Sequence, residues 1–238
     1  MLKAIVFDMD GVIIDSHPVH REAWKNFLFS LGRRVSETDL DFILEGWRRE
    51  DILRHFFGKI SEDQITEYGN RKDEFFRKVG LPVRTVPGLP EFLAHLEDRR
   101  ILKAVATSAS EKRTYSTIGQ LQLTRYFTAI VTGNDVPHGK PDPAIYLMAA
   151  ELMNVHSKDV VAFEDSVSGV KAAKAAGMRC LGIADDARSE MLRVAGADYI
   201  IPNFVGMTLD RLEWLLVSLS SEDESEKVQT VSRRPHRA

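Results

Sequence analysis

The sequence has little of what secreted, membrane-spanning or disulfide-rich proteins need. Its 238 residues include one cysteine, Cys180, so neither an internal disulfide nor a cysteine-rich zinc site can form. It has no run of about 20 apolar residues, the length that spans a bilayer. The apolar run at residues 4–7 ends in acidic residues and is too short for a signal peptide. We therefore expect a cytoplasmic protein with no membrane partner.

An excess of positive charge is also missing. The chain has 32 Lys and Arg against 35 Asp and Glu, a formal net charge of −3, and so lacks the basic field with which proteins hold nucleic acid. What it does have is 44% hydrophobic residues, enough for a sizeable core. At roughly 150 residues per domain, the length predicts one to two domains.

Short apolar, β-branched runs alternate with amphipathic segments of helical spacing. Such alternation predicts βαβ units and a parallel sheet covered on both faces, an α/β fold with a Rossmann-like core. The expected strands are 2–7, 102–106, 129–131, 160–163, 180–183 and 199–201. The expected helices between them are 111–121, 143–152, 166–176 and 188–195.

A helical insert interrupts this pattern after the first strand. Val19, Ala23, Phe27 and Leu31 follow one another at intervals of four, and helical spacing continues without a convincing buried strand. We therefore predict two domains. The catalytic core consists of 1–14 and 84–220, the helical cap of 15–83, and the charged segment 221–238 forms a flexible tail.

Polar residues that can perform chemistry come at the ends of three expected strands and in one loop between strands. In an open parallel sheet, ligands bind beyond the carboxyl ends of the strands, so these side chains are expected to meet at one edge. The candidates are Asp8, Asp10, Thr107, Ser108, Lys140, Glu164 and Asp165. Four carboxylates at one place need a cation to offset their repulsion, and all-oxygen ligands favour a hard ion such as Mg²⁺.

Asp8 and Asp10 are two residues apart at the end of a strand, so both side chains can point to the same side. Gly11 lets the chain turn there. One carboxylate can then attack an electrophile while the other moves a proton. Phosphorus is the natural electrophile, because the metal, Lys140 and Thr107 can stabilise phosphoryl oxygens.

These motifs, in this order, resemble those of the haloacid dehalogenase superfamily of aspartate-dependent phosphotransferases. The matching segments are 8–12 (DMDGV), 106–108 (ATS), 139–141 (GKP) and 164–169 (EDSVSG). The resemblance implies that Asp8 forms an aspartyl-phosphate, that Asp10 is the acid and base, and that Thr107 and Lys140 hold the phosphoryl group. It also implies Mg²⁺ bound by the Asp8 carboxylate, the Asp10 main-chain carbonyl and Asp165, with Glu164 ordering metal-bound water.

The insert resembles the helical cap of the β-phosphoglucomutase-like branch of this superfamily. The resemblance implies that Arg49 binds a distal phosphate of the substrate, that His20 lies near the acid and base, and that Lys72 reaches a sugar. Ser108 is expected to line the same substrate site. From the residues alone, Arg49 could equally be a solvated charge, His20 a packed histidine and Lys72 a plain helix-face lysine.

The predicted function is Mg²⁺-dependent hydrolysis of a small phosphomonoester, most plausibly a sugar phosphate, by a monomer. The alternative is a β-phosphoglucomutase, which passes the phosphoryl group from the aspartyl-phosphate to another sugar hydroxyl. Trp47 stands where the branch is expected to carry a small residue, and Asp73 where the mutases carry an amide. The segment 195–202 is more similar to the phosphatases of the branch.

Two more distant alternatives use related residues. A signalling receiver domain also has an aspartate, a Thr or Ser, a lysine and Mg²⁺ on a parallel sheet, but it needs no cap. A dehalogenase uses the same nucleophile on carbon, but Asp10 and the acidic pair at 164–165 are superfluous for that reaction.

Overall fold

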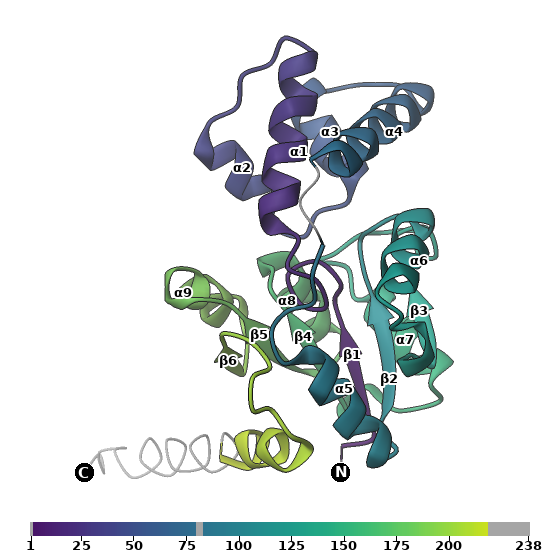
Figure 1. Cartoon of the computed structure of the whole chain (residues 1–238), viewed down its shortest axis with the longest axis vertical. Coiled ribbons are helices and arrows are strands. Elements are labelled where there is room, and N and C mark those ends of the chain that lie inside the picture. Colours follow the sequence, from purple (N-terminus) through teal and green to yellow (C-terminus); the bar gives the residue numbers. More distant parts are fainter. Residues whose placement is uncertain (1, 80–82, 219–238) are drawn as a thin grey trace, which may run out of the picture.

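A computed structural model describes residues 2–79 and 83–218 of the chain. Its strands are β1 (Ala4–Phe7), β2 (Leu102–Ala106), β3 (Ala129–Val131), β4 (Val160–Glu164), β5 (Arg179–Ile183) and β6 (Tyr199–Ile201). Within the described residues they form one parallel sheet in the order β3-β2-β1-β4-β5-β6 (Figure 1). The strand order reverses at β1, so a crevice forms where β1 and β4 end.

Helices cover both faces of this sheet, which explains why its strands are almost continuously apolar. The flanking helices are α5 (Leu89–Asp98), α6 (Glu111–Gln120), α7 (Ala144–Leu152), α8 (Val167–Ala175) and α9 (Asp186–Ala195). Residues of α5 and α6 pack with Phe7 and Phe163 on one face. Residues of α7 and α8 pack with Val6 and Ala162 on the other.

The predicted α/β class is confirmed, and each expected strand lies within two residues of an observed one. The sequence interpretation did not include α5. Its signals were present: Leu89, Phe92, Leu93 and Leu96 have helical spacing, and all four are fully buried. No helix in the described parts of the chain combines the length and apolarity required to cross a membrane.

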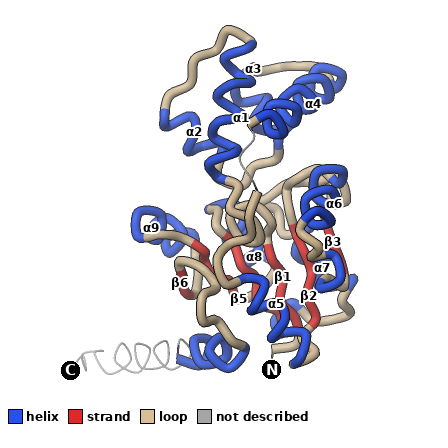
Figure 2. The backbone as a smooth tube through the Cα atoms, viewed as in Figure 1, coloured by secondary structure: helices blue, strands red, loops and turns tan. Residues whose placement is uncertain are grey.

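Four helices lie between β1 and α5 and form a separate group above the sheet, joined to it by loops (Figure 2). They are α1 (His17–Ser30), α2 (Glu37–Ile43), α3 (Arg49–Phe57) and α4 (Glu62–Lys78). Their apolar faces share a small aromatic-rich core of their own, which includes Trp24, Phe27 and Leu53.

We call this group, with its loops, the cap. The division into a core of 1–14 and 84–220 and a cap of 15–83 stays our proposal. All four cap helices fall inside the proposed boundaries. Of the predicted tail, 221–238, all residues lie outside those that the structure describes.

Candidate active site

A pocket of about 180 Å³ lies between the cap and the carboxyl ends of β1, β2 and β4. Most of the candidate residues line it, namely Asp8, Asp10, His20, Arg49, Lys72, Thr107, Ser108 and Asp165. Lys140 and Glu164 lie directly beneath and bind to Asp8 or to each other. The chain therefore brings the residues singled out in the core and in the cap to one site, as βα topology allows.

Asp8 is held at the bottom of this site by a buried ammonium group. Nζ of Lys140 lies 2.5 Å from Oδ1 of Asp8 and 2.5 Å from Oε1 of Glu164, and it also donates to the carbonyl of Ala106 at 3.1 Å. Burial raises the pKa of Asp8 well above its usual value, although Lys140 opposes the shift; Glu164 adds to it. A further positive charge is needed to keep Asp8 ionised as a nucleophile.

Glu164 acts as an internal acceptor. It is completely buried, and its Oε1 accepts a hydrogen bond of 2.7 Å from the hydroxyl of Tyr146 in addition to Lys140. Its Oε2 accepts from the main chain of Asp165 and from Ser166 at 2.9–3.1 Å. Because both oxygens are satisfied by protein groups, Glu164 fixes Lys140 beside Asp8. Its role toward the metal stays a prediction.

Asp10 is bound from three directions. Its Oδ1 accepts hydrogen bonds from Ser16 Oγ at 2.6 Å, His20 Nε2 at 3.1 Å and Arg113 Nη1 at 3.0 Å. Arg113 Nη2 binds the other oxygen, Oδ2. Burial alone would raise the pKa of Asp10, but Arg113 and then His20 outweigh burial and hold that pKa well below the usual value.

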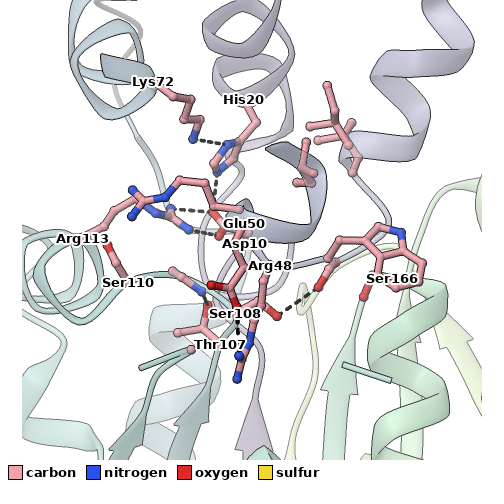
Figure 3. A pocket seen from close by; sticks show the side chains of 18 of the residues that line it. Asp10, His20, Arg48, Glu50, Lys72, Thr107, Ser108, Ser110, Arg113 and Ser166 are labelled. Atoms are coloured by element: carbon pink, nitrogen blue, oxygen red, sulfur yellow. Dashed lines mark hydrogen bonds and ion pairs between the residues drawn. The ribbon is translucent and has the colours of Figure 1, made fainter. Parts of the chain in front are cut away.

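The cap contributes a short chain of contacts behind Asp10. Lys72 Nζ of α4 lies 3.1 Å from Nδ1 of His20, whose Nε2 in turn faces Asp10 (Figure 3). Burial, with Lys72 close by, lowers the pKa of His20 to about 3, so the ring is neutral and Nε2 carries its proton. Burial and the nearby Arg113 lower the pKa of Lys72 to about 7.

Asp165 lies beside Gly11 at the entrance to α8. Its Oδ2 is buried and pairs with two cationic side chains: Nε2 of His17 lies 2.6 Å away and Nη1 of Arg188 lies 3.7 Å away. Gly11 adopts a φ of +77°, and a Cβ there would lie 2.1 Å from this oxygen. Glycine is therefore required both for the turn and for the approach of Asp165.

These donors fit a hard cation by their chemistry. Two carboxylates, Asp8 and Asp165, and the main-chain carbonyl of Asp10 are all oxygen ligands. The buried oxygen of Asp165 faces His17, whose place a cation could take, and Asp8 needs positive charge to ionise. In the described part of the chain, no three side chains of His, Cys, Asp or Glu form a ready cage. The predicted set has two carboxylates and a carbonyl, so it does not require such a cage.

The loop between α2 and α3 closes the pocket against the core. Ser108 Oγ donates to the carbonyl of Gly46 at 3.0 Å, and Ser168 Oγ donates to the carbonyl of Glu45. Arg48 donates to the carbonyl of Val136 at 2.6 Å. Ser108 thus binds the cap loop in this closed arrangement, and its predicted contact with substrate remains a prediction.

Thr107 lines the pocket from the core and Arg49 lines it from the cap. Thr107 is buried at the end of β2, where its Oγ1 accepts from the main chain of Ala109 at 3.1 Å. Arg49 begins α3 and pairs with Asp73 Oδ2 at 2.7 Å. Gly69 makes room for its guanidinium, because a Cβ there would lie 2.6 Å from Cζ of Arg49.

Sequence reasoning did not single out several of these groups. They are Ser16, His17, Arg113, Tyr146 and Arg188. Arg113 had a detectable signal, because it stands in the first turn of the helix that follows β2, on the ligand-binding edge of the sheet. Tyr146 had no such signal, because the apolar helix around it predicts only that the tyrosine is buried and does not indicate that its hydroxyl binds Glu164.

Comparison with known proteins gives a consistent assignment. A family model described as haloacid dehalogenase-like hydrolase matches residues 5–183. The chain is 34% identical over 189 residues to the phosphorylated carbohydrates phosphatase of Thermotoga maritima, which covers 74% of this chain and 82% of that protein. It is 30% identical over 224 residues to the β-phosphoglucomutase of Bacillus subtilis, covering 90% of this chain and 96% of that protein.

The fold agrees with a solved structure of β-phosphoglucomutase from Clostridium difficile. The two superpose with a TM-score of 0.78 over 90% of this chain and 97% of the other. Their identity is 21%, so this likeness concerns the fold alone.

Proposed function

Because the chain belongs to the haloacid dehalogenase-like hydrolase family and is an enzyme of the phosphohydrolase and phosphotransferase type, we propose that it is a Mg²⁺-dependent phosphatase of a small phosphorylated sugar. The observation that carries the proposal is the buried Asp8–Lys140–Glu164 cluster with Asp10 beside it. Such a cluster serves a nucleophilic carboxylate and a separate proton carrier.

In the first step, a carboxylate oxygen of Asp8 attacks phosphorus and the bond from phosphorus to the ester oxygen breaks. Asp10 is ionised while Arg113 and His20 bind it, so it must take up a proton once these contacts loosen in the substrate complex. It then gives this proton to the departing alkoxide, which leaves as an alcohol. Lys140, fixed by Glu164, stays beside Asp8 while negative charge spreads over the phosphoryl oxygens. Thr107, which lines the pocket directly after β2, would donate a hydrogen bond to one of them.

In the second step, water attacks the phosphorus of the aspartyl-phosphate. Asp10 takes a proton from this water, the acyl-phosphate bond breaks, and inorganic phosphate leaves with Asp8 restored as a carboxylate. Bound Mg²⁺, held by Asp8, Asp165 and the Asp10 carbonyl, would supply positive charge against the repulsion between the enzyme carboxylates and the phosphate.

The size and lining of the pocket favour a small, polar substrate. Its volume lies below the range typical of drug-sized ligands, and its walls carry Arg49, Lys72 and Arg113 together with Trp47. The cationic groups suit anionic and hydroxyl oxygens, and the indole of Trp47 offers a face on which a sugar can stack. The proposal also places the protein in the cytoplasm, as a monomer.

A β-phosphoglucomutase is the second candidate. It is supported by the relative of that name, because the match with this chain covers 96% of the relative's length. The two activities differ in the oxygen that reaches the aspartyl-phosphate, which is that of water in one and of a sugar hydroxyl in the other. Asp73 favours the phosphatase, because it neutralises Arg49 at 2.7 Å. In a mutase the bisphosphate intermediate binds in two orientations, so this ion pair would have to open twice in each turnover, whereas in a phosphatase it would open once.

The test is to trap the intermediate and identify its products. The wild-type protein and Asp8→Asn are mixed with a panel of sugar phosphates, nucleotides and pyrophosphate in the presence of Mg²⁺, and the reaction is quenched with acid. We expect phosphate release and a phosphorylated Asp8 in the wild type, and neither in Asp8→Asn. Phosphorylation of another residue, or undiminished turnover by Asp8→Asn, would refute the mechanism. Conversion of β-glucose 1-phosphate to glucose 6-phosphate without phosphate release would establish the mutase instead.

A further inference from the structure

Arg113 lies in the first turn of α6 and binds the carboxylate that the proposed mechanism needs to be free. Its guanidinium reaches both oxygens of Asp10, with Nη1 3.0 Å from Oδ1 and Nη2 bound to Oδ2. The Arg113 side chain is 14% exposed, and Figure 3 shows it extended across the pocket toward Asp10. A two-pronged contact of this kind fixes both the place and the orientation of a carboxylate.

This contact conflicts with proton transfer by Asp10. The carboxyl group has to present one oxygen to the leaving group and then to water. Both oxygens bind Arg113, and Oδ1 accepts hydrogen bonds from Ser16 and His20 as well. At least one prong of the Arg113 contact must therefore be released before Asp10 can act.

An anionic group is the natural competitor for these donors. Arginine stays charged at all accessible pH values, and its planar N–H groups match a carboxylate or a phosphate equally well. The guanidinium also lies over the ring of Phe76, with Cζ 5.6 Å from the ring centre, so it sits between the core and helix α4 of the cap. A substrate that enters between core and cap meets it there.

On the basis of the proposed function, we propose that Arg113 is a positioning residue for Asp10, which it holds by both oxygens in the free enzyme and releases when a second anionic group of the substrate takes over its N–H donors. The preferred substrates are then phosphomonoesters that carry a second phosphate or a carboxylate. With such an ester, binding of the substrate itself releases Asp10 from Arg113.

The experiment compares pairs of esters that differ by one anionic group, for example fructose 6-phosphate with fructose 1,6-bisphosphate and glycerol 3-phosphate with 3-phosphoglycerate. Values of kcat and KM are measured for the wild type, Arg113→Met, Arg113→Lys and Lys112→Met. Lys112 is the matched control, because it is the preceding residue of α6 and is exposed. Thermal unfolding of each variant confirms that it is folded.

For the wild type we expect kcat to favour the doubly anionic ester of at least one pair. In Arg113→Met this kcat ratio should fall about 10- to 100-fold, the effect of losing charge-assisted hydrogen bonds. Arg113→Lys should restore part of the ratio, because it keeps the charge without the fork, and Lys112→Met should leave the ratio unchanged.

Each other result overturns the proposal in a distinguishable way. An equal fall of kcat for both esters would show a merely structural role. A rise in KM for the doubly anionic ester at constant kcat would show a simple binding group, and an unchanged ratio in Arg113→Met would show no role at all. A wild type that turns over both members of every pair equally well also contradicts it. If the wild type releases phosphate from no ester, the proposed function fails, and this inference fails with it.

Discussion

Replacement of Gly169 by alanine tests the packing that fixes Lys140 beside Asp8. Gly169 lies in the first turn of α8, and a Cβ at this position would be 1.8 Å from Oε1 and 1.9 Å from Cδ of Glu164. Glu164 cannot move into solvent, because it is completely buried and its oxygens bind Lys140, Tyr146 and Ser166. The added methyl group must therefore displace either the carboxylate or the helix.

The size of the effect follows from these contacts. Forcing extra volume into a packed interior costs about 1–3 kcal/mol, and weakening a hydrogen bond to a charged group costs about 1.5–3 kcal/mol. These costs add to about 2.5–6 kcal/mol, and the better helix propensity of alanine offsets about 1 kcal/mol of them. We therefore expect Gly169→Ala to lower the free energy of unfolding by about 1.5–5 kcal/mol, or the melting temperature by about 3–20 °C for a chain of this size. Because Glu164 orients Lys140 beside Asp8, kcat should fall as well.

Gly119→Ala is the matched control. Gly119 also lies in a helix, α6, and a Cβ there would meet no atom within 4 Å. Alanine is the better helix former by about 1 kcal/mol, so this variant should be as stable as the wild type or slightly more so. Both variants are compared by urea denaturation and by phosphate release. If Gly169→Ala is as stable in urea as Gly119→Ala and keeps full activity, the inference that Glu164 packs closely against α8 is wrong.

Three further predictions concern the metal and the cap. Removal of divalent ions with EDTA should abolish phosphate release and added Mg²⁺ should restore it; activity that persists in EDTA would contradict the metal requirement. Lys72→Met should stabilise the protein, because the lowered pKa of Lys72 means that the charged form is less favourable in the folded state than in the unfolded state. Lys72 therefore contributes stability at high pH that is lost as the pH falls to about 7. The advantage of the variant in urea denaturation should be largest near pH 6 and should shrink towards pH 10. An advantage that grows with pH would show the opposite sign. Arg49→Met should raise KM about tenfold for an ester with a distal anionic group and little for an aryl phosphate; equal effects on both would remove Arg49 from distal recognition.

The strands and the residues at their ends could be predicted because buried parallel strands leave a strong local signal. Leu2–Phe7, for example, is an apolar run followed at once by two aspartates and a glycine, and its strand and turn are observed there. The signal of α5 was equally local but went unused. In such segments the burial of each residue follows from its neighbours in sequence.

The partners of the charged residues could not be predicted in the same way. Lys140 reaches Asp8 across 132 residues, and Arg113 reaches Asp10 across 103. Pairings of this length depend on how the sheet and the cap bring the ends of elements together, which no local pattern specifies. Lys140 was named from its place in a strand-connecting loop and again from the motif shared with a known family. The family resemblance gave no indication of Arg113.

The contacts of the two aspartates separate their roles physically. Asp8 is held by Lys140, which Glu164 fixes in turn, and all three belong to the core, so the position of the cap does not alter the setting of the nucleophile. Asp10 is bound by Ser16 and His20, which connect it to the start and first turn of α1, and by Arg113 from the core. A movement of the cap must therefore change the contacts of the acid and base while it leaves the nucleophile in place. We therefore expect cap closure to control when the proton moves, and selection among substrates to act on that step.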